Sequence, residues 1–207
     1  MRKTFILLFL AGFLTAGIGV GTRLYPPLRD MPAKDTVPAK KPGDYFPLSR
    51  GSTWLYEGEG SEFASFTREV LFTSGDRAQL LEDNGGTIMA SVFKVSRSEV
   101  KRVFALAESY DGRYLLDQEP NDNTVILKSP LQVGTRWNIP SGEREIIATD
   151  ATVETPAGTF NDCLKVRIAG TSSTIFEYYK EGVGMVKREF ISGKTRVTST
   201  LKSFSIK

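Results

Sequence analysis

Three carboxylates near the C-terminus, Glu177, Glu181 and Glu189, are the first residues whose type and spacing could do chemistry. A glycosidase needs two carboxylates about 5–10 Å apart across a sugar cleft, and neighbouring strands could supply them. A charged sheet surface would carry the same residues, and Lys180 and Lys187 lie near enough in the sequence to pair with Glu181. We therefore interpret this group as a solvated face and keep a carboxylate-based hydrolase as an alternative.

A second group of oxygen ligands lies in the segment 119–123, which reads EPNDN. It lacks the alternating Asp/Asn order and the terminal bidentate glutamate of a calcium-binding EF-hand. Segments rich in Asn and Asp are usually turns, and we expect a turn here. The sequence predicts no metal site and no cofactor site.

The chain contains one cysteine, Cys163, and no histidine. Without histidine, Ser–His and Cys–His catalysis, most zinc enzymes and the usual transition-metal sites are excluded. Alternation with Leu164 and Val166 predicts that Cys163 lies on the opposite face of a strand. Lys165 or Arg167 could mildly activate its thiol. We favour a structural role, in which Cys163 fills a gap between larger side chains.

Both tryptophans end a related segment, P-L-x-x-G-x-x-W, at residues 47–54 and 130–137. The pattern is typical of a proline-led turn, a glycine with positive φ, and a strand that begins with a large aromatic anchor. We expect Trp54 and Trp137 to pack into a core. Exposed tryptophans that stack on a ligand are the alternative. Two copies could mark a duplicated half, although eight residues cannot establish a duplication.

From residue 44 onward the apolar residues mostly alternate with polar ones, which predicts antiparallel strands with one buried face. Bulky residues, including Tyr178 and Tyr179, enrich one of these strands. With Trp54 and Trp137, these two tyrosines are the candidate ligand-binding residues. Turn residues separate about ten candidate strands, with no clear helix between them. The clearest turns are at 84–86, 111–112, 141–142, 169–170 and 192–193.

One segment, 96–107, fits two structures. Ser96 and Glu99 have the spacing of a helix capping box, and Val100, Val103 and Phe104 fall at helical spacing. The same residues also fit a strand. We predict a strand, with one short helix as the alternative.

The N-terminus has the pattern of an export signal. A short basic head, Arg2 and Lys3, precedes an uncharged apolar run over residues 5–21. We predict a signal peptide or signal anchor over 1–21, favour a retained anchor, and exclude lipidation because no cysteine follows the run. Five prolines in 22–43 predict a disordered, extended spacer of up to roughly 60 Å.

The overall formal charge of +3 comes from this N-terminal part. Seven of the 27 Lys and Arg residues and two of the 24 acidic residues lie in 1–43, which leaves 20 basic and 22 acidic residues in 44–207. A nucleic-acid-binding domain concentrates positive charge on its folded part. The sequence therefore argues against a nucleic-acid partner.

Three stretches resemble an uncharacterised domain of exported bacterial envelope proteins that includes the TapB-like group. They read DYFPLSRGSTWLYEGEG (44–60), VETPAGTFNDCLKV (153–166) and FEYYKEGVGMVKREF (176–190). The resemblance implies an envelope location and a β-sheet domain, and it supplies no catalytic residue. It also implies a distant likeness to the open half-barrels of LolA-like lipoprotein carriers, which is a likeness of fold alone.

Taken together, these patterns predict a mainly β domain over 44–207, an antiparallel meander that forms a curved sheet, a half-barrel or a sandwich. It would be held outside the cytoplasm by an N-terminal hydrophobic helix, or be secreted if the signal is cleaved. The function that we expect is non-enzymatic binding at the cell envelope, with a lipid or another hydrophobic ligand on the concave face. The alternatives are a closed adaptor domain that contacts an envelope protein or wall polymer, and a hydrolase of envelope polysaccharide.

Overall fold

The computed structural model describes residues 39–207, and its regular structure is almost entirely antiparallel strand, which confirms the mainly β fold class. The N-terminal helix and most of the spacer predicted from the sequence fall in 1–38, outside the described residues. Within 39–207, no helix is long and apolar enough to cross a membrane. The elements are a 3-10 helix at Pro42–Tyr45 and the strands β1 (Thr53–Glu59), β2 (Phe66–Ser74), β3 (Arg77–Asp83), β4 (Ile88–Val95), β5 (Glu99–Leu106), β6 (Thr124–Lys128), β7 (Arg136–Ile139), β8 (Gly142–Thr155), β9 (Gly158–Ala169), β10 (Thr174–Lys180), β11 (Gly184–Ser192) and β12 (Thr195–Ser205).

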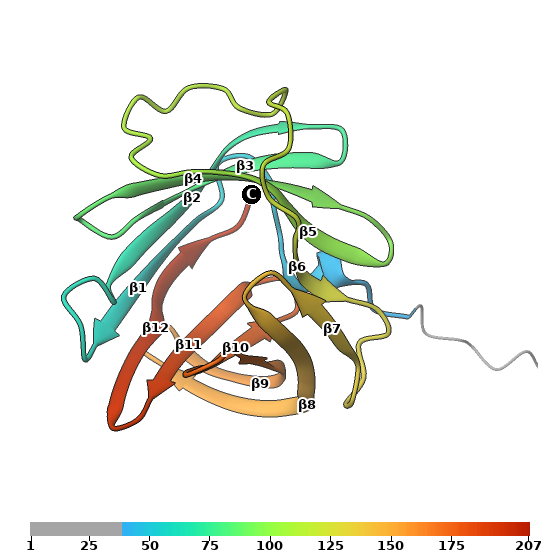
Figure 1. Ribbon diagram of the computed structural model, residues 1–207, viewed down its shortest axis with the longest axis vertical. Coiled ribbons are helices and arrows are strands. Elements are labelled where there is room, and N and C mark those ends of the chain that lie inside the picture. The colour runs from blue at the N-terminus through green and yellow to red at the C-terminus, as the bar shows by residue number, and fades with distance from the viewer. Residues whose placement is uncertain (1–38) are drawn as a thin grey trace, which may run out of the picture. The chain divides into compact units, whose positions relative to one another are not determined.

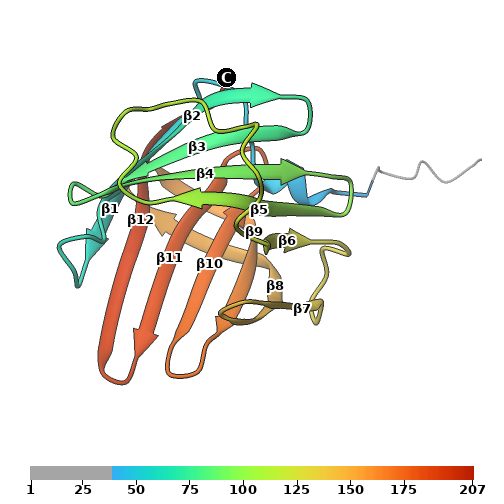
Figure 2. The ribbon, with the colours of Figure 1, turned by 45° about the horizontal axis from the view of Figure 1, so that its top comes forward.

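All twelve strands form one sheet in the order β6-β5-β4-β3-β2-β1-β12-β11-β10-β9-β8-β7. The order divides into two meanders of six strands, β1–β6 and β7–β12, which we call the first and second meander. They are joined where β1 pairs with β12 over the full length of β1, from Thr53 opposite Ser205 to Glu59 opposite Thr198. Figures 1 and 2 show the sheet curling until its two end strands, β6 and β7, come near each other.

The end strands β6 and β7 are neighbours without a hydrogen-bonded ladder, so the barrel-like sheet is nearly closed. Two side chains bridge the boundary instead. The indole Nε1 of Trp137 donates to the carbonyl of Val125 at 3.0 Å, and Nη1 of Arg144 donates to the carbonyl of Ile126 at 3.1 Å. We call this boundary the seam.

The two P-L-x-x-G-x-x-W segments fold alike. Gly51 has φ +80° and donates to Val70 at 2.8 Å, while Gly134 has φ +89° and donates to Ile146 at 2.9 Å. The amide of the buried Val70 donates in return to the carbonyl of Ser52 at 3.0 Å. The amide of the buried Ile146 donates in the same way to the carbonyl of Thr135, also at 3.0 Å. Each segment thus joins the start of one strand to the next strand in the same way, and the two meanders begin with the same structural unit.

The likeness continues further into the meanders. The fourth strand of each meander contains a bulge where it pairs with the fifth. In the pairing of β4 with β5 the bulge lies between Val92 and Phe93, and in the pairing of β10 with β11 it lies between Tyr178 and Tyr179. The aromatic residue after each bulge points at Phe46, with ring centroids 5.0 Å apart for Phe93 and 6.3 Å apart for Tyr179. Phe46, which follows the 3-10 helix, therefore packs between equivalent positions of the two meanders.

The segment 96–107 is strand, as predicted, because β5 covers most of it. The Ser96 hydroxyl explains why the sequence resembled a helix cap. It accepts the amides of Ser98 at 3.2 Å and Glu99 at 3.0 Å, which is the geometry of a capping serine used here to hold the turn between β4 and β5.

A second, smaller apolar cluster lies on the outer face of β4 and β5, beneath the long loop 107–123 that Figure 1 shows arching over these strands. Leu115 and Leu116 of the loop are buried there. The buried amide of Gln79 fixes the loop, since Nε2 donates to Arg113 O and Oε1 accepts Leu115 N, each at 2.8 Å. The predicted turn at 111–112 lies within this loop, while the other four predicted turns join consecutive strands.

Candidate functional site

The interior of the sheet contains a cavity of about 410 Å³. This volume lies in the range of small-molecule sites, roughly 300–1,000 Å³. Its lining includes the buried Phe46 and Tyr179 as well as half-buried Thr87 and exposed Ser141. The lining residues come from both meanders: Phe46, Arg68, Leu80, Glu82, Asn84, Thr87, Met89, Ser91, Phe93, Arg102, Thr124, Ile126, Ile139, Ser141, Arg144, Ile168, Ile175, Glu177, Tyr179 and Arg188.

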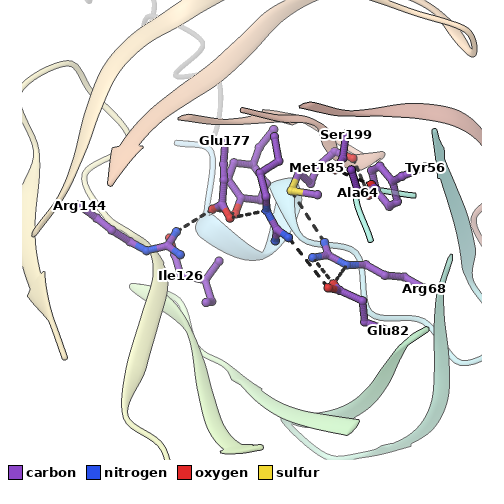
Figure 3. A network of polar contacts seen from close by, with 11 residues as sticks. Tyr56, Ala64, Arg68, Glu82, Ile126, Arg144, Glu177, Met185 and Ser199 are labelled. Atoms are coloured by element: carbon purple, nitrogen blue, oxygen red, sulfur yellow. Dashed lines mark hydrogen bonds and ion pairs between the residues drawn. The ribbon is translucent and has the colours of Figure 1, made fainter. Parts of the chain in front are cut away.

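Five charged side chains form a continuous network across this interior (Figure 3). Glu177 of β10 accepts Arg144 Nη1 at 2.9 Å and Arg188 Nε at 3.2 Å. Glu82 of β3 accepts Arg68 Nε at 2.7 Å and lies 4.0 Å from Arg188 Nη1. Because β3 and β11 belong to different meanders, Arg188 links two opposite parts of the sheet through the interior.

Both glutamates of the network are held ionised. Burial by itself would raise the pKa of Glu177, but the opposing effect of Arg144, Arg188 and the Tyr179 hydroxyl is larger and lowers this pKa to about 2. The pKa of Glu82 is also lowered, because Arg68 and Arg188 outweigh the effect of its burial. At neutral pH the network therefore contains three cations and two anions.

Tyr179 is the one of the four predicted ligand-binding residues that lines the cavity. Its hydroxyl donates to Glu177 Oε2 at 2.5 Å, and burial, followed by the nearby Glu177 carboxylate, raises the pKa of the phenol. The phenol is thus a neutral hydrogen-bond donor that fixes the glutamate, and its ring lines the cavity and packs against Phe46.

The other three predicted residues lie elsewhere. Trp54 is buried, and its Nε1 donates to Val183 O at 2.7 Å, while Trp137 is buried at the seam. Tyr178 points to the other face of β10, where its hydroxyl donates to Glu189 Oε2 at 2.9 Å. Both tryptophans thus pack into the core, as the repeated segment predicted.

The structure separates the three carboxylates Glu177, Glu181 and Glu189. Glu177 belongs to the interior network, and Glu189 lies beside Tyr178 and Lys187 on the outer face. Glu181 lies in the turn after β10 and pairs with Lys40 at 2.8 Å. The last residues of the predicted spacer, 39–43, belong to the folded unit, which begins at Ala39 and in which Pro42 is buried.

The oxygen-rich segment 119–123 is used for internal hydrogen bonds. The Asn121 side chain binds both the amide and the carbonyl of Ala105, at 2.8 and 2.9 Å. Asp122 accepts Arg102 Nε at 2.7 Å and Thr124 N at 2.8 Å. Within 39–207, no group of three His, Cys, Asp or Glu side chains is arranged to hold a metal ion.

Cys163 is buried in the main core, although alternation had predicted that it lies on the wetter face of the strand. Burial raises the pKa of the thiol to about 11. The cysteine therefore fills space as a neutral thiol, which agrees with the structural role that we favoured.

Sequence reasoning missed the interior arginines, although one signal was available. Arg68 and Arg144 each lie directly opposite the tryptophan of their own meander in the ladder, Trp54 or Trp137. Each arginine also stands two residues before the buried Val70 or Ile146, in the strings R-E-V and R-E-I. The repeated P-L-x-x-G-x-x-W segment is thus followed, in the second strand of each meander, by an arginine that points into the interior.

The DUF3108-like family profile matches residues 107–202, which is less than half of the chain. Two solved structures are similar in fold. A candidate exported protein with a YmcC-like fold from Bacteroides fragilis is 15% identical, with a TM-score of 0.47, and a candidate lipoprotein from Parabacteroides distasonis is 13% identical, with a TM-score of 0.43. In both cases the similarity covers 78% of this chain and 98% of the other. No curated protein matches the chain.

Proposed function

We propose that this chain is a non-enzymatic binding module of the bacterial cell envelope and that its interior cavity holds a small ligand. The observation that carries the proposal is the cavity of about 410 Å³ inside the nearly closed sheet, whose lining combines buried, half-buried and exposed residues. Small-molecule sites are concave, of this size, and combine an apolar lining with a few convergent polar groups. Ile126, Ile139, Ile168 and Ile175 supply the apolar part here.

The electrostatics favour binding over hydrolysis. A carboxylate-based hydrolase needs one carboxyl group that stays protonated at working pH, which requires a raised pKa. Glu82, Glu177 and Glu189 all have a lowered pKa, because arginine or lysine side chains outweigh the effect of burial. None of these three carboxylates is therefore suited to act as a general acid.

The envelope location rests on the N-terminal sequence, in which residues 5–21 would bind the membrane as a retained anchor or direct secretion. The finer resemblance to the TapB-like group and to LolA-like carriers rests on the sequence strings at 44–60, 153–166 and 176–190. A lipid is one ligand that the isoleucine wall could accept. An adaptor that contacts an envelope protein or wall polymer remains the alternative, since such a domain needs no occupied cavity.

Native mass spectrometry of the full chain, purified from a bacterial host in a non-ionic detergent and followed by organic extraction, tests the proposal. We expect a reproducible bound mass. The variant Ile175→Trp, which fills the cavity, should lose it, and Leu55→Trp should keep it because Leu55 is partly exposed and does not line the cavity. An unliganded mass for the natural chain, with no uptake from an added bacterial lipid extract, would contradict the proposal.

A further inference from the structure

The interior network has an uncompensated positive charge. Arg68, Arg144 and Arg188 face two carboxylates, Glu82 and Glu177, and both carboxylates are ionised. A fourth cavity arginine, Arg102, is already neutralised by Asp122 at 2.7 Å. Each of the three arginines has a carboxylate partner, but the network as a whole keeps one surplus positive charge, and such a site attracts an anion that can enter it.

Arg188 makes the fewest hydrogen bonds of the three arginines in the network. Arg68 contacts Glu82 through both Nε and Nη2, at 2.7 and 2.6 Å. Arg144 donates to both Glu177 and the seam carbonyl of Ile126. Among the described residues, Arg188 makes one hydrogen bond, from Nε to Glu177, and neither of its Nη groups makes one. Its side chain is 30% exposed, and it lines the cavity, so those donors are available to a ligand.

Four isoleucines line the cavity beside the charged network. Ile168 and Ile175 lie opposite each other in the ladder between β9 and β10, and Ile175 is two residues before Glu177 on the same face. Ile126 and Ile139 line the cavity from β6 and β7, on the two sides of the seam. A ligand whose charged head rests on the network therefore meets a hydrocarbon surface over the rest of its length.

From this arrangement we infer that the ligand is an organic anion with one negative charge, a carboxylate or phosphate-type head bound by Arg188 and an apolar tail along the isoleucines. Guanidinium groups bind such heads with paired, charge-assisted hydrogen bonds. The inference rests on the proposed binding role of the cavity and names the class of compound that fills it. The same head chemistry occurs in acyl chains and lipids and in small free anions, which differ in the tail.

Calorimetric titration of the full chain in phosphatidylcholine nanodiscs, with empty nanodiscs as the blank, separates these cases. The probes are octanoate, octan-1-ol with the same tail and no charge, and acetate with the same head and no tail. We expect octanoate to bind about tenfold or more tightly than octan-1-ol, because hydrogen bonds to charged groups are the strong ones. Acetate should bind more weakly than octanoate, and acetate binding as tightly as octanoate would overturn the part of the inference that assigns a tail.

Variants locate the head. Arg188→Gln should weaken octanoate binding about tenfold or more while leaving octan-1-ol unchanged, and Arg188→Lys should fall between, since it keeps the charge and loses the planar fork. Arg167→Gln is the matched control, because Arg167 lies on β9, pairs with Glu145 and does not line the cavity. Equal affinity for octanoate and octan-1-ol would overturn the inference and leave the binding module intact. No binding of any probe, together with an unliganded mass spectrum, would count against the binding module itself.

Discussion

The two boundaries between the meanders are built differently although the meanders begin alike. At the first boundary β1 and β12 form a ladder along the whole of β1. At the seam β6 and β7 make no ladder, and the side chains of Trp137 and Arg144 take its place. Trp54 and Arg68, which hold the equivalent positions in the first meander, also bond to the second meander, at Val183 and Met185, but the ladder between β1 and β12 already closes their boundary. A tryptophan and an arginine at equivalent positions thus pack in the interior beside the β1–β12 ladder, and at the seam they connect β6 to the second meander.

This difference connects the seam with the cavity. Arg144 uses one nitrogen, Nη1, for both the seam carbonyl of Ile126 and the network carboxylate of Glu177. A backbone ladder would hold the boundary shut independently of the interior. A side-chain closure instead ties the boundary to the charges in the cavity. We therefore expect substitutions in the network to loosen the contact between β6 and β7 and to leave the β1–β12 ladder in place.

The largest expected effect is the loss of Arg144. Arg144→Met should lower the free energy of unfolding by about 3–5 kcal/mol, because it breaks a buried ion pair by removing one partner. Chemical denaturation measures the loss, and hydrogen exchange should rise in β6 and β7. The matched variant Arg68→Met should cost a similar amount without faster exchange in those strands. Faster exchange in β1 and β12 with Arg144→Met would mean that the two boundaries do not differ as described.

Acid should weaken the same network. The pKa of Glu177 is lowered from an ordinary value of 4.5 to about 2, so its contribution to stability is present above pH 4.5 and is lost as the pH falls from there towards 2. The size of the loss is on the order of 3 kcal/mol. Denaturation curves across this range should show it, and Glu177→Gln, though less stable at neutral pH, should show a flatter dependence. An unchanged slope in the variant would remove Glu177 from the explanation.

A smaller effect is expected from the tryptophans. Trp137→Phe leaves the Val125 carbonyl without its donor, and Trp54→Phe does the same to Val183. Each should cost about 1–3 kcal/mol, the cost of a buried unpaired group. Only the change at Trp137 should speed hydrogen exchange at the seam. If both variants speed it equally, the seam is not held by this indole.

The smallest effect is expected from an ion pair on the surface of the first boundary. Lys202 and Glu57 join β12 to β1 at 3.2 Å, and each side chain is 50% exposed. Lys202→Ala should change the free energy of unfolding by about 0–1 kcal/mol, because exposed pairs contribute little. It should leave exchange in β1 and β12 unchanged, since the backbone ladder carries that boundary.

Local patterns predicted much of this fold. Alternation and turn residues predicted the antiparallel meander, and the repeated P-L-x-x-G-x-x-W segment predicted two packed tryptophans. The burial of Cys163 was not predicted, because alternation distinguishes the two faces of a strand but does not show what covers each face.

The candidate site was largely beyond prediction for a different reason. An arginine at an inward position can be recognised as buried only when its partner is known, and the partners lie 14 residues away for Arg68 and 33 for Arg144. Arg188 and Glu82 meet across the interior only because the sheet curls. Glu177 and Tyr179 were noticed from the sequence, as a carboxylate and an aromatic, but their place in the charged network appears only when β10 is placed beside β11 and opposite β3.

The most direct test of the central claim, that a small ligand occupies the charged cavity between the two meanders, is hydrogen–deuterium exchange of the full chain with and without saturating octanoate. We predict slower exchange in β10 and β11 around Glu177 and Arg188 and at the seam strands β6 and β7, with little change in the loop 107–123. Unchanged exchange at saturation, or slowing confined to that loop and the outer face, would contradict the claim.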